Sequence, residues 1–258
     1  MNSASRQSLT AILSALPEEQ HGLLDQLQGA RKKTVAGRDF WLGNLHGHPA
    51  ALGLSRIGKV SATLTAAVLI GHLGASRIVF TGVAGGLAHG VKVGDVVIAH
   101  DFIQHDLDAS PLFPRYEVPL YGRSRFPCDP ALTALLTQAA DRALAGSNQA
   151  TSPLLARAQV HTGLIASGDR FVSSANESKH LQAALQVAGH MALAVEMEGA
   201  AVAQVCADYG VDFAAMRTIS DRADDTAHID FQTFVAEVAS GYAQRIIEEL
   251  MRSLPAPG

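Results

Sequence analysis

Cysteine, a residue that marks several large classes of protein, is nearly missing from this sequence. Among 258 residues there are two, Cys128 and Cys206, and they lie far apart and form no C-x-x-C pair. This spacing suggests neither a disulfide framework nor a thiolate metal site. We therefore expect two free thiols in a reducing compartment.

Long runs of one kind of side chain are also missing. No apolar run reaches the length that crosses a membrane, and the first ten residues are polar and lack the apolar segment of a secretion signal. The formal net charge is −4, without a long run of Lys and Arg, which disfavours a nucleic-acid surface or an anionic membrane surface. We expect a soluble, cytoplasmic protein whose partners are small molecules.

The composition is otherwise that of a large globular domain with a full hydrophobic core. Of the 258 residues, 48% are hydrophobic and 17% are charged, which is enough apolar surface for one large core. No shift in composition, internal repeat or low-complexity tract marks a boundary. The sequence predicts one α/β domain over residues 1–258.

The hydrophobic pattern alternates between segments typical of strands and segments typical of helices. Strands are expected at 9–16, several times within 34–54, and at 77–80, 96–103, 158–166, 193–195 and 213–219. Helices are expected to begin at Pro17 and to cover 59–73, 130–145, 177–186, 197–208 and 231–254. Acids at the first turn of a helix complement its dipole, so Glu18 and Glu19 taken alone are explained as capping residues.

The segment around which the chain is organised is residues 194–201, where an apolar run ends in Glu196, Met197 and Glu198. About twenty residues later, the apolar run 213–216 ends in the same way, in Arg217 and then Ser220-Asp221. Charges at the edge of a core need a partner or a chemical role. Strand ends in open α/β sheets are also where ligands bind.

Two glycine-containing loops follow predicted strands. Residues 53–60 match the spacing of a phosphate-binding P-loop, but Val60 lacks the hydroxyl that would bind magnesium, which argues against an ATPase. Residues 81–87, Thr-Gly-Val-Ala-Gly-Gly-Leu, can bring the backbone close to a ligand. Their spacing is not G-x-G-x-x-G, so a dinucleotide site is not predicted.

Two further segments were weighed for function. Residues 105–108, His-Asp-Leu-Asp, could ligate a metal, but no further His or Cys cluster follows at ligand spacing. A polar strand end is the better explanation, and no metal is expected. Residues 109–130 are irregular and rich in Pro, Tyr and Phe, which is typical of an active-site lid or an interface.

Taken together, these motifs resemble the 5′-methylthioadenosine/S-adenosylhomocysteine nucleosidases of the purine nucleoside phosphorylase superfamily. The resemblance extends from Ala11 to about Leu250, and its six markers occur in the right order and spacing. They are residues 15–19, 57–60, 81–87, 167–171, 195–198 and 217–221. The resemblance implies a three-layer α/β/α fold with a central mixed, twisted sheet, no cofactor, and a homodimer.

The resemblance also implies three catalytic acids. Breaking the bond between adenine and ribose develops positive charge on the sugar and negative charge on the base, and carboxylates can serve both needs. Asp221, held by Ser220, would protonate adenine at N7. Glu198 would bind the ribose 2′- and 3′-hydroxyls, and Glu19 would position and deprotonate the attacking water.

The remaining site residues are implied in the same way. Phe171 would stack on adenine, backbone groups of Val172 would bind the base edge, and Met197 would lie under the sugar. Ile57 would face the 5′ substituent, and Phe113 and Tyr116, in the lid, would cover that substituent in the neighbouring subunit. The other expected substrate contacts are Ala84, Gly85, Arg217, Ser220 and Phe231.

Two residues depart from the family pattern and keep alternatives open. Val83 stands where a Ser is usual, and Arg56 stands where a Gly is common. A phosphorylase would hold phosphate with an Arg just before the glycine-rich loop and a hydroxyl inside it, but this chain has Phe80 and Val83 there. Hydrolysis is therefore favoured, although Arg56 could bind an anion.

Other functions on the same fold also remain open. The alternatives are a nucleosidase for another nucleoside, such as futalosine or AMP, and a non-catalytic nucleoside-binding protein. Without the resemblance, Phe171, Met197 and Phe231 would be explained as core residues and Asp221 as a loop cap. The hydrolase prediction therefore rests on the joint pattern.

Overall fold

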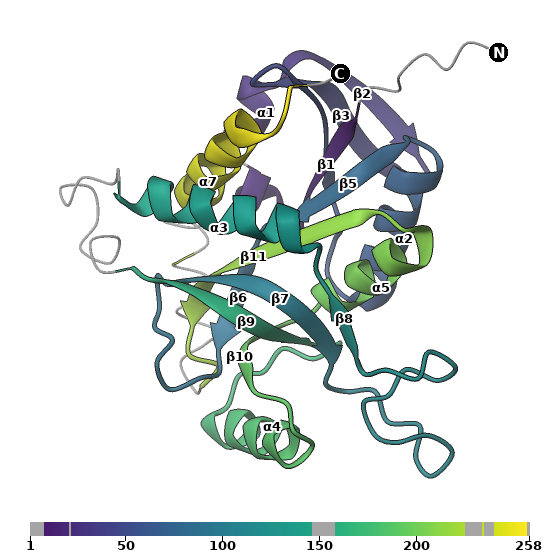
Figure 1. The fold of residues 1–258 in the computed structure, drawn as a ribbon, viewed down its shortest axis with the longest axis vertical. Coiled ribbons are helices and arrows are strands. Elements are labelled where there is room, and N and C mark those ends of the chain that lie inside the picture. Colours follow the sequence, from purple (N-terminus) through teal and green to yellow (C-terminus); the bar gives the residue numbers. More distant parts are fainter. Residues whose placement is uncertain (1–7, 21, 146–157, 225–233, 235–239, 257–258) are drawn as a thin grey trace.

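Eleven strands and the helices around them make up the described part of this computed structural model, which covers residues 8–20, 22–145, 158–224, 234 and 240–256 (Figure 1). The strands are β1 Leu9–Ser14, β2 Gln28–Val35, β3 Arg38–Leu45, β4 His48–Leu54, β5 Ala75–Phe80, β6 Val83–Gly86, β7 Val96–Gln104, β8 Arg125–Pro127, β9 Val160–Ser167, β10 Ala192–Glu196 and β11 Asp212–Asp221. The helices are α1 Leu23–Gln26, α2 Lys59–Gly71, α3 Pro130–Ala145, α4 Ala175–Val187, α5 Gly199–Tyr209 and α7 Ser240–Ser253, with a 3₁₀ turn at Pro17–Gln20.

The strands form one mixed sheet in the order β2-β3-β4-β1-β5-β11-β6-β10-β9-β7-β8. Strand β11 is central to it, because it pairs in parallel with β5 and β6 and antiparallel with β7. Since β6, β10, β9 and β7 also pair in succession, these four strands and β11 close into a ring. The predicted α/β fold with a mixed central sheet is confirmed.

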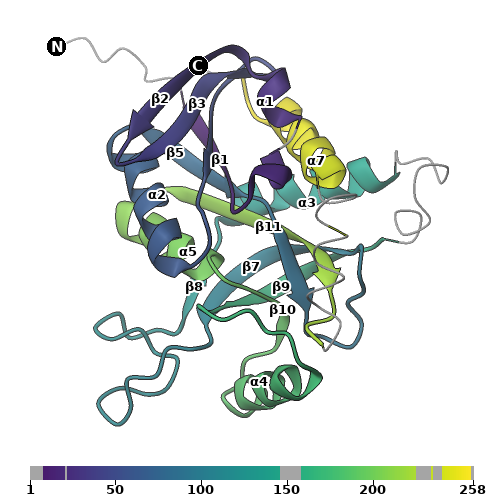
Figure 2. The ribbon, with the colours of Figure 1, turned by 180° about the vertical axis from the view of Figure 1, so that it is seen from behind.

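Helices cover both faces of the sheet, as Figures 1 and 2 show from opposite sides. Neighbouring residues of β1 point to opposite faces, as a strand requires. Leu13 packs in the cluster that includes α2 and α5, whereas Ile12 packs in the cluster that includes α3 and α7. Helix α4 lies apart from both pairs and packs near β9 and β10 through a third, smaller cluster.

The element predictions are mostly confirmed, but the helix predicted from Pro17 is a 3₁₀ turn at Pro17–Gln20 followed by the short α1, and β2 begins at Gln28, before the strands predicted within 34–54. Residues 83–86 of the glycine-rich loop form strand β6, and residues 125–127 within the irregular segment form β8. Helix α5 begins at Gly199, because Glu198 occupies its N-cap position. The last predicted helix is present as α7, while most of its predicted beginning lies outside the described residues.

Within the described residues, no helix combines the length and the apolar character needed to cross a membrane.

Candidate active site

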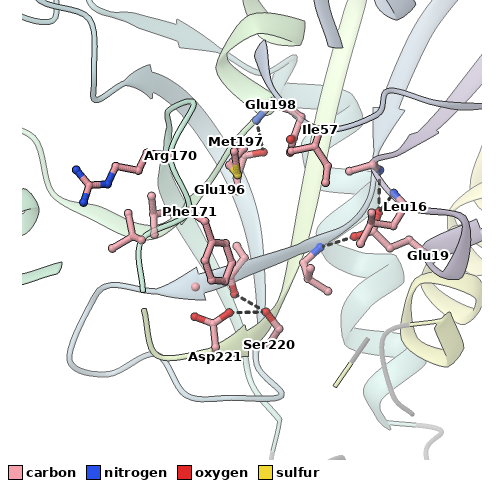
Figure 3. Close-up of a pocket in the computed structure, with 16 residues that line it drawn as sticks. Leu16, Glu19, Ile57, Arg170, Phe171, Glu196, Met197, Glu198, Ser220 and Asp221 are labelled. Carbon is pink, nitrogen blue, oxygen red and sulfur yellow. Dashed lines mark hydrogen bonds between the residues drawn. The ribbon is translucent and has the colours of Figure 1, made fainter. Parts of the chain in front are cut away.

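A cavity of about 430 Å³ opens where several strands end (Figure 3). Its lining comes from the residues just after β1, from β6 and from the ends of β10 and β11, with the start of α2 and the segment after β9 completing it. This is the edge of the sheet where α/β folds bind ligands. The described residues that line it are Ala15, Leu16, Glu19, Ile57, Val83, Ala84, Gly85, Arg170, Phe171, Val172, Val195, Glu196, Met197, Glu198, Ser220 and Asp221.

Glu19 lies in the 3₁₀ turn that follows β1, and it is only 2% exposed. Its Oε2 accepts hydrogen bonds from the N–H groups of Ala15 (2.7 Å) and Leu16 (2.9 Å), and its Oε1 accepts one from Val83 (3.1 Å). Burial raises the pKa of Glu19 above its ordinary value, although these N–H groups and the charge of Arg217 oppose the rise. Such a carboxyl group is suited to accept a proton near neutral pH.

Glu196 ends β10 and is held from several sides. Its Oε2 lies 2.7 Å from Nη2 of Arg217, which is 1% exposed and also contacts the ring face of Phe80. The hydroxyl of Ser167 donates a short hydrogen bond to Oε1, and the N–H of Gly199 donates to both oxygens. Glu196 and Arg217 are therefore a buried ion pair with its hydrogen bonds satisfied.

Glu198, two residues later, is buried to the same extent as Glu196 but has a different environment. Its Oε1 accepts one hydrogen bond, 2.8 Å long, from the N–H of Gly58. Burial and the nearby negative charge of Glu196 raise the pKa of Glu198 to about 8. The residue thus presents to the cavity a carboxyl group that can carry a proton at neutral pH.

Asp221 ends β11 on the opposite side of the cavity from Glu198 (Figure 3) and is 2% exposed. The hydroxyl of Ser220 donates to its Oδ2 (2.7 Å), and the N–H of Ala223 donates to its Oδ1 (2.8 Å). Gly85 passes so close that a Cβ there would lie 2.9 Å from Oδ1. A side chain at that position would therefore displace the carboxylate.

Apolar side chains occupy the space between the acids. In Figure 3, the ring of Phe171 lies between Met197 and the Ser220-Asp221 pair, and Ile57 lies near Glu198. Phe171 is 41% exposed and Ile57 is 57% exposed, values that are high for large apolar side chains. Arg170 points away from the acids and forms an ion pair with Glu177 (2.8 Å). A cavity with polar groups at its ends and apolar sides suits a small, flat ligand.

Most of the site residues predicted from the sequence are brought together here. Those that line the cavity are Glu19, Ile57, Ala84, Gly85, Phe171, Val172, Met197, Glu198, Ser220 and Asp221. Arg217 does not line it, because its guanidinium turns behind the cavity to Glu196, Phe80 O and Met216 O. Phe231 lies outside the described residues.

The two predicted lid residues are also outside this cavity. Tyr116 is 1% exposed within its own chain, where it packs with Ile103, Leu164 and Val172. Phe113 is half-buried in the same segment. The structure of one chain therefore does not bring either residue to the cavity.

The two residues that depart from the family pattern have clear positions. Val83 lines the cavity with its side chain and binds Glu19 through its N–H. Arg56 is exposed and donates from Nη2 to the carbonyl of Gly37 (2.8 Å), away from the cavity lining. An anion site at Arg56 therefore has no support in the structure.

The segment 105–108, weighed above as a metal site, forms other contacts. Asp106 pairs with Lys59 (2.5 Å), and Asp108 accepts from the hydroxyl of Ser110 (2.6 Å). Across the described residues, no group of three or more His, Cys, Asp or Glu side chains is arranged to hold a metal ion.

Some lining residues had no predicted role. Glu196 precedes Glu198 by two residues, but this spacing does not indicate which of the two acids forms an ion pair with Arg217. Ala15, Leu16, Arg170 and Val195 also line the cavity. All four belong to the marker motifs of the family resemblance, which assigned no individual role to them.

Comparison with known proteins agrees with this geometry. A family model described as the phosphorylase superfamily matches residues 10–252. A curated 5′-methylthioadenosine/S-adenosylhomocysteine nucleosidase from Bacillus thuringiensis (strain Al Hakam) is 36% identical over 244 residues, covering 93% of this chain and 98% of the relative.

Two solved structures show the same fold. The nucleosidase of that name from Neisseria meningitidis, in complex with methylthio-immucillin-A, has a TM-score of 0.85 at 32% identity, covering 96% of this chain and 100% of the other. A futalosine hydrolase mutant from Helicobacter pylori has a TM-score of 0.82 at 30% identity, with the same coverage. The chain belongs to the phosphorylase superfamily and, within it, to the family of 5′-methylthioadenosine/S-adenosylhomocysteine nucleosidases.

Proposed function

We propose that this protein hydrolyses the N-glycosidic bond of 5′-methylthioadenosine and S-adenosylhomocysteine, releasing adenine and the 5′-thioribose. The observation that carries the proposal is the placement of three buried carboxyl groups, Glu19, Glu198 and Asp221, around one cavity of about 430 Å³. Curated and structural relatives with this activity in their names match nearly the whole chain.

Asp221 is the general acid of this mechanism. As the glycosidic bond breaks, negative charge develops on adenine, and a proton delivered to N7 makes adenine a better leaving group. The hydroxyl of Ser220 and the N–H of Ala223 fix the orientation of the Asp221 carboxyl group. Gly85 leaves room for it at the edge of the cavity.

Glu198 and Glu19 act on the sugar side. Glu198 binds the ribose 2′- and 3′-hydroxyls, and the positive charge that develops on the sugar favours its ionised form, which in turn stabilises the oxocarbenium-like transition state. Glu19 accepts a proton from the attacking water, a role that its raised pKa supports. Three backbone N–H groups hold its carboxylate at the turn after β1 and therefore reduce its freedom to move.

The apolar side chains position the nucleoside. Phe171 stacks on adenine while backbone groups of Val172 bind its edge, and Met197 lies under the ribose. Ile57 faces the 5′ substituent at the open side of the cavity.

Water, rather than phosphate, is the nucleophile of the proposed reaction. Phosphate would need a cation close to the sugar, and Arg170 is the one Lys or Arg among the described residues that line the cavity. Its side chain is 75% exposed and pairs with Glu177, while Arg56 binds the carbonyl of Gly37. Glu19 lies near the sugar and would repel an anion.

The direct test measures adenine release from both substrates in phosphate-free buffer and then with phosphate added. We expect the same rate of release in both buffers, with free methylthioribose as the sugar product from methylthioadenosine and S-ribosylhomocysteine as the sugar product from S-adenosylhomocysteine. A rate that depends on phosphate would show a phosphorylase. Binding of the nucleoside without release in either buffer would favour a non-catalytic binding protein.

Futalosine belongs in the same assay, because one structural match is a futalosine hydrolase at a TM-score of 0.82. The same three carboxyl groups could cleave any nucleoside that fits, and the 5′ substituent decides the fit. Faster release of its own purine base from futalosine than of adenine from methylthioadenosine would reassign the substrate without changing the mechanism.

We also propose that the protein acts as a homodimer. Helix α2 begins beside the cavity, and Val60 and Leu64 lie one turn apart on it, with exposures of 83% and 43%. Ile57, at the cavity, extends this apolar face, which a second copy would bury. The segment 109–130 would then act as the lid, with Phe113 over the partner's 5′ substituent, whereas Tyr116, which is 1% exposed within its own chain, supports the segment from inside. Sedimentation equilibrium tests this, and a monomer at assay concentrations would contradict it.

A further inference from the structure

Three segments that are far apart in sequence meet at Lys59, on the rim of the cavity. The ammonium group of Lys59 contacts Asp106 Oδ1 (2.5 Å) and Gln104 Oε1 (3.1 Å), both near the end of β7. Asp106 Oδ2 in turn accepts a hydrogen bond from the N–H of Asp169 (2.8 Å), in the segment that follows β9. The Lys59 side chain is 16% exposed, whereas the side chains of Asp106 and Asp169 are 32% and 50% exposed, so the ammonium group is mostly buried beneath two partly exposed carboxylates.

Asp169 also completes the beginning of helix α2. The N-cap residue of α2 is Gly58, which has no side chain to cap the helix. Asp169 Oδ1 accepts the N–H of Lys59 (2.8 Å) from outside the helix, and a Cβ at Gly58 would lie 3.2 Å from that oxygen. A carboxylate at a helix N-terminus is stabilising, so this contact fixes the segment after β9 to α2.

The end of β7 supports the same segment from the other side. The N–H of His105 donates to the carbonyl of Ser167 (2.9 Å), and the ring of His105 fills the space where a side chain on Gly168 would lie. Partial burial would raise the pKa of Asp106, but the hydrogen bonds from Lys59 and from the N–H of Asp169 hold it below its ordinary value. Asp106 is therefore an anion at neutral pH and can bind both groups at once.

These contacts connect two parts of the cavity that the proposed reaction uses. Gly58, next to Lys59, donates the hydrogen bond that holds Glu198 (2.8 Å). Phe171 lies two residues after Asp169 and lines the same cavity. The ribose-side carboxyl group and the adenine-side ring therefore share one support.

We propose that Lys59, with Asp106 and Asp169, is a positioning network that sets Phe171 and Glu198 at a fixed separation across the bound nucleoside. Lys59 lies outside the described cavity lining, so it is a positioning residue and not a catalytic one. The role of the network in turnover rests on the proposed function. Its role in holding the start of α2 against the segment that follows β9 does not.

The proposal predicts a loss in kcat larger than the change in KM. Stacking and hydroxyl binding can each still form when the support is lost, but not in the relative orientation that the transition state requires. A misplacement of reacting groups by about 1 Å can lower a rate on the order of 10²-fold.

The experiment compares Lys59→Met, Lys59→Arg and Asp106→Asn with a matched control, Lys32→Met. Lys32 forms a similar ion pair with Asp39 (2.7 Å), but on β2 and β3, away from the cavity. We expect Lys59→Met to lower kcat by about 10- to 100-fold and Lys59→Arg to recover most of it. Lys32→Met should stay within about 2-fold of the wild type.

Two further measurements separate positioning from simple destabilisation. The Tm of Lys59→Met should lie within about 3 °C of that of Lys32→Met, because both remove one partly exposed ion pair. The double variant Lys59→Met/Asp106→Asn should lose little more activity than Lys59→Met alone, since both changes break one network.

Hydrogen exchange of the ligand-free protein tests the network independently of activity. Amides of residues 58–59 and 168–171 should exchange faster in Lys59→Met and remain unchanged in Lys32→Met. Unchanged exchange at these amides, or full kcat in Lys59→Met, would overturn the proposal. If the wild type releases no adenine, the proposed function fails, and the exchange result still decides whether Lys59 holds the two segments.

Discussion

The buried acids around the cavity fall into two groups. Glu196 is neutralised by a cation within the protein, whereas Glu19, Glu198 and Asp221 accept hydrogen bonds from backbone N–H or hydroxyl groups. Glu196 is paired with Arg217 and accepts hydrogen bonds from Ser167 and Gly199, so it is held from several sides. Glu198, buried to the same degree, accepts one hydrogen bond from Gly58, and its pKa rises to about 8. Two acids in one short motif thus have different environments: the first is anchored at the strand end, and the second faces the cavity.

The difference shows how a fold can keep several carboxyl groups in one place. Four adjacent anions without a cation would repel one another and would be costly to bury. Arg217 neutralises Glu196, which has no role in the proposed reaction, and its charge also favours the ionised form of Glu19. The remaining acids keep open sides toward the cavity. We therefore expect substitutions in the two groups to affect different properties.

Asp221→Asn should have the largest effect on activity. The amide retains the shape and can still accept hydrogen bonds, but it cannot deliver a proton to adenine, so kcat should fall on the order of 10²- to 10⁴-fold. The free energy of unfolding should change by less than about 1 kcal/mol. Steady-state kinetics and urea unfolding measure both quantities. An unchanged kcat would remove Asp221 from the role of general acid.

Glu196→Ala should have the largest effect on stability. It leaves the guanidinium of Arg217 buried without its partner, which lowers the free energy of unfolding by about 3–5 kcal/mol. The matched control is Glu249→Ala on α7, which breaks partly exposed pairs with Arg142 and Arg252 and should lose about 1 kcal/mol or less. Equal losses in the two variants would contradict the anchoring role of Glu196.

The pH dependence of stability should reveal Glu198. Its pKa is raised in the folded state, so the folded protein binds more protons than the unfolded chain between pH 4.5 and about 8. The stabilisation from this group is therefore complete below pH 4.5 and is lost as the pH rises to about 8, by at most about 1.4 kcal/mol per pH unit. Glu198→Gln should remove this part of the slope in urea unfolding. A slope that stays unchanged in the variant would place the titration on another group.

Arg56→Ala should have the smallest effect. Its guanidinium binds the carbonyl of Gly37 at the surface and does not reach the cavity, so kcat/KM should stay within about 2-fold of the wild type. The rate should also remain independent of phosphate. A loss of activity confined to assays with phosphate would show that Arg56 binds an anion.

Patterns in the sequence predicted the parts of the site that depend on strand ends. The apolar runs that finish in Glu198 and Asp221 locate these acids at one edge of the sheet, because the ends of neighbouring strands meet in space. Glu19, taken alone, is explained as a capping residue, and only the family resemblance places it beside them. The two faces of β1 follow from strand geometry, in which successive side chains alternate, so that Leu13 and Ile12 lie on opposite faces.

The direction of a long side chain could not be predicted in the same way. Arg217 needs an anion, and the sequence contains two candidates, a ligand or the nearby Glu196. Only the arrangement of β10 and β11 within the folded sheet shows that Glu196 accepts the hydrogen bond from the Arg217 guanidinium. Tyr116 lies in an irregular segment without a repeating pattern, so nothing in the sequence indicated that its ring packs inside its own chain.

The order of strands has a consequence for how the molecule avoids aggregation. Because β11, β6, β10, β9 and β7 close into a ring, the described sheet has free edges only at β2 and β8. Strand β8 has three residues, too few to template another chain, and β2 carries Arg31, Lys32 and Lys33 in succession. Short length and positive charge both discourage a second sheet from adding to an edge. Association of copies through helix faces is therefore not accompanied by edge-to-edge addition of strands into a continuous sheet.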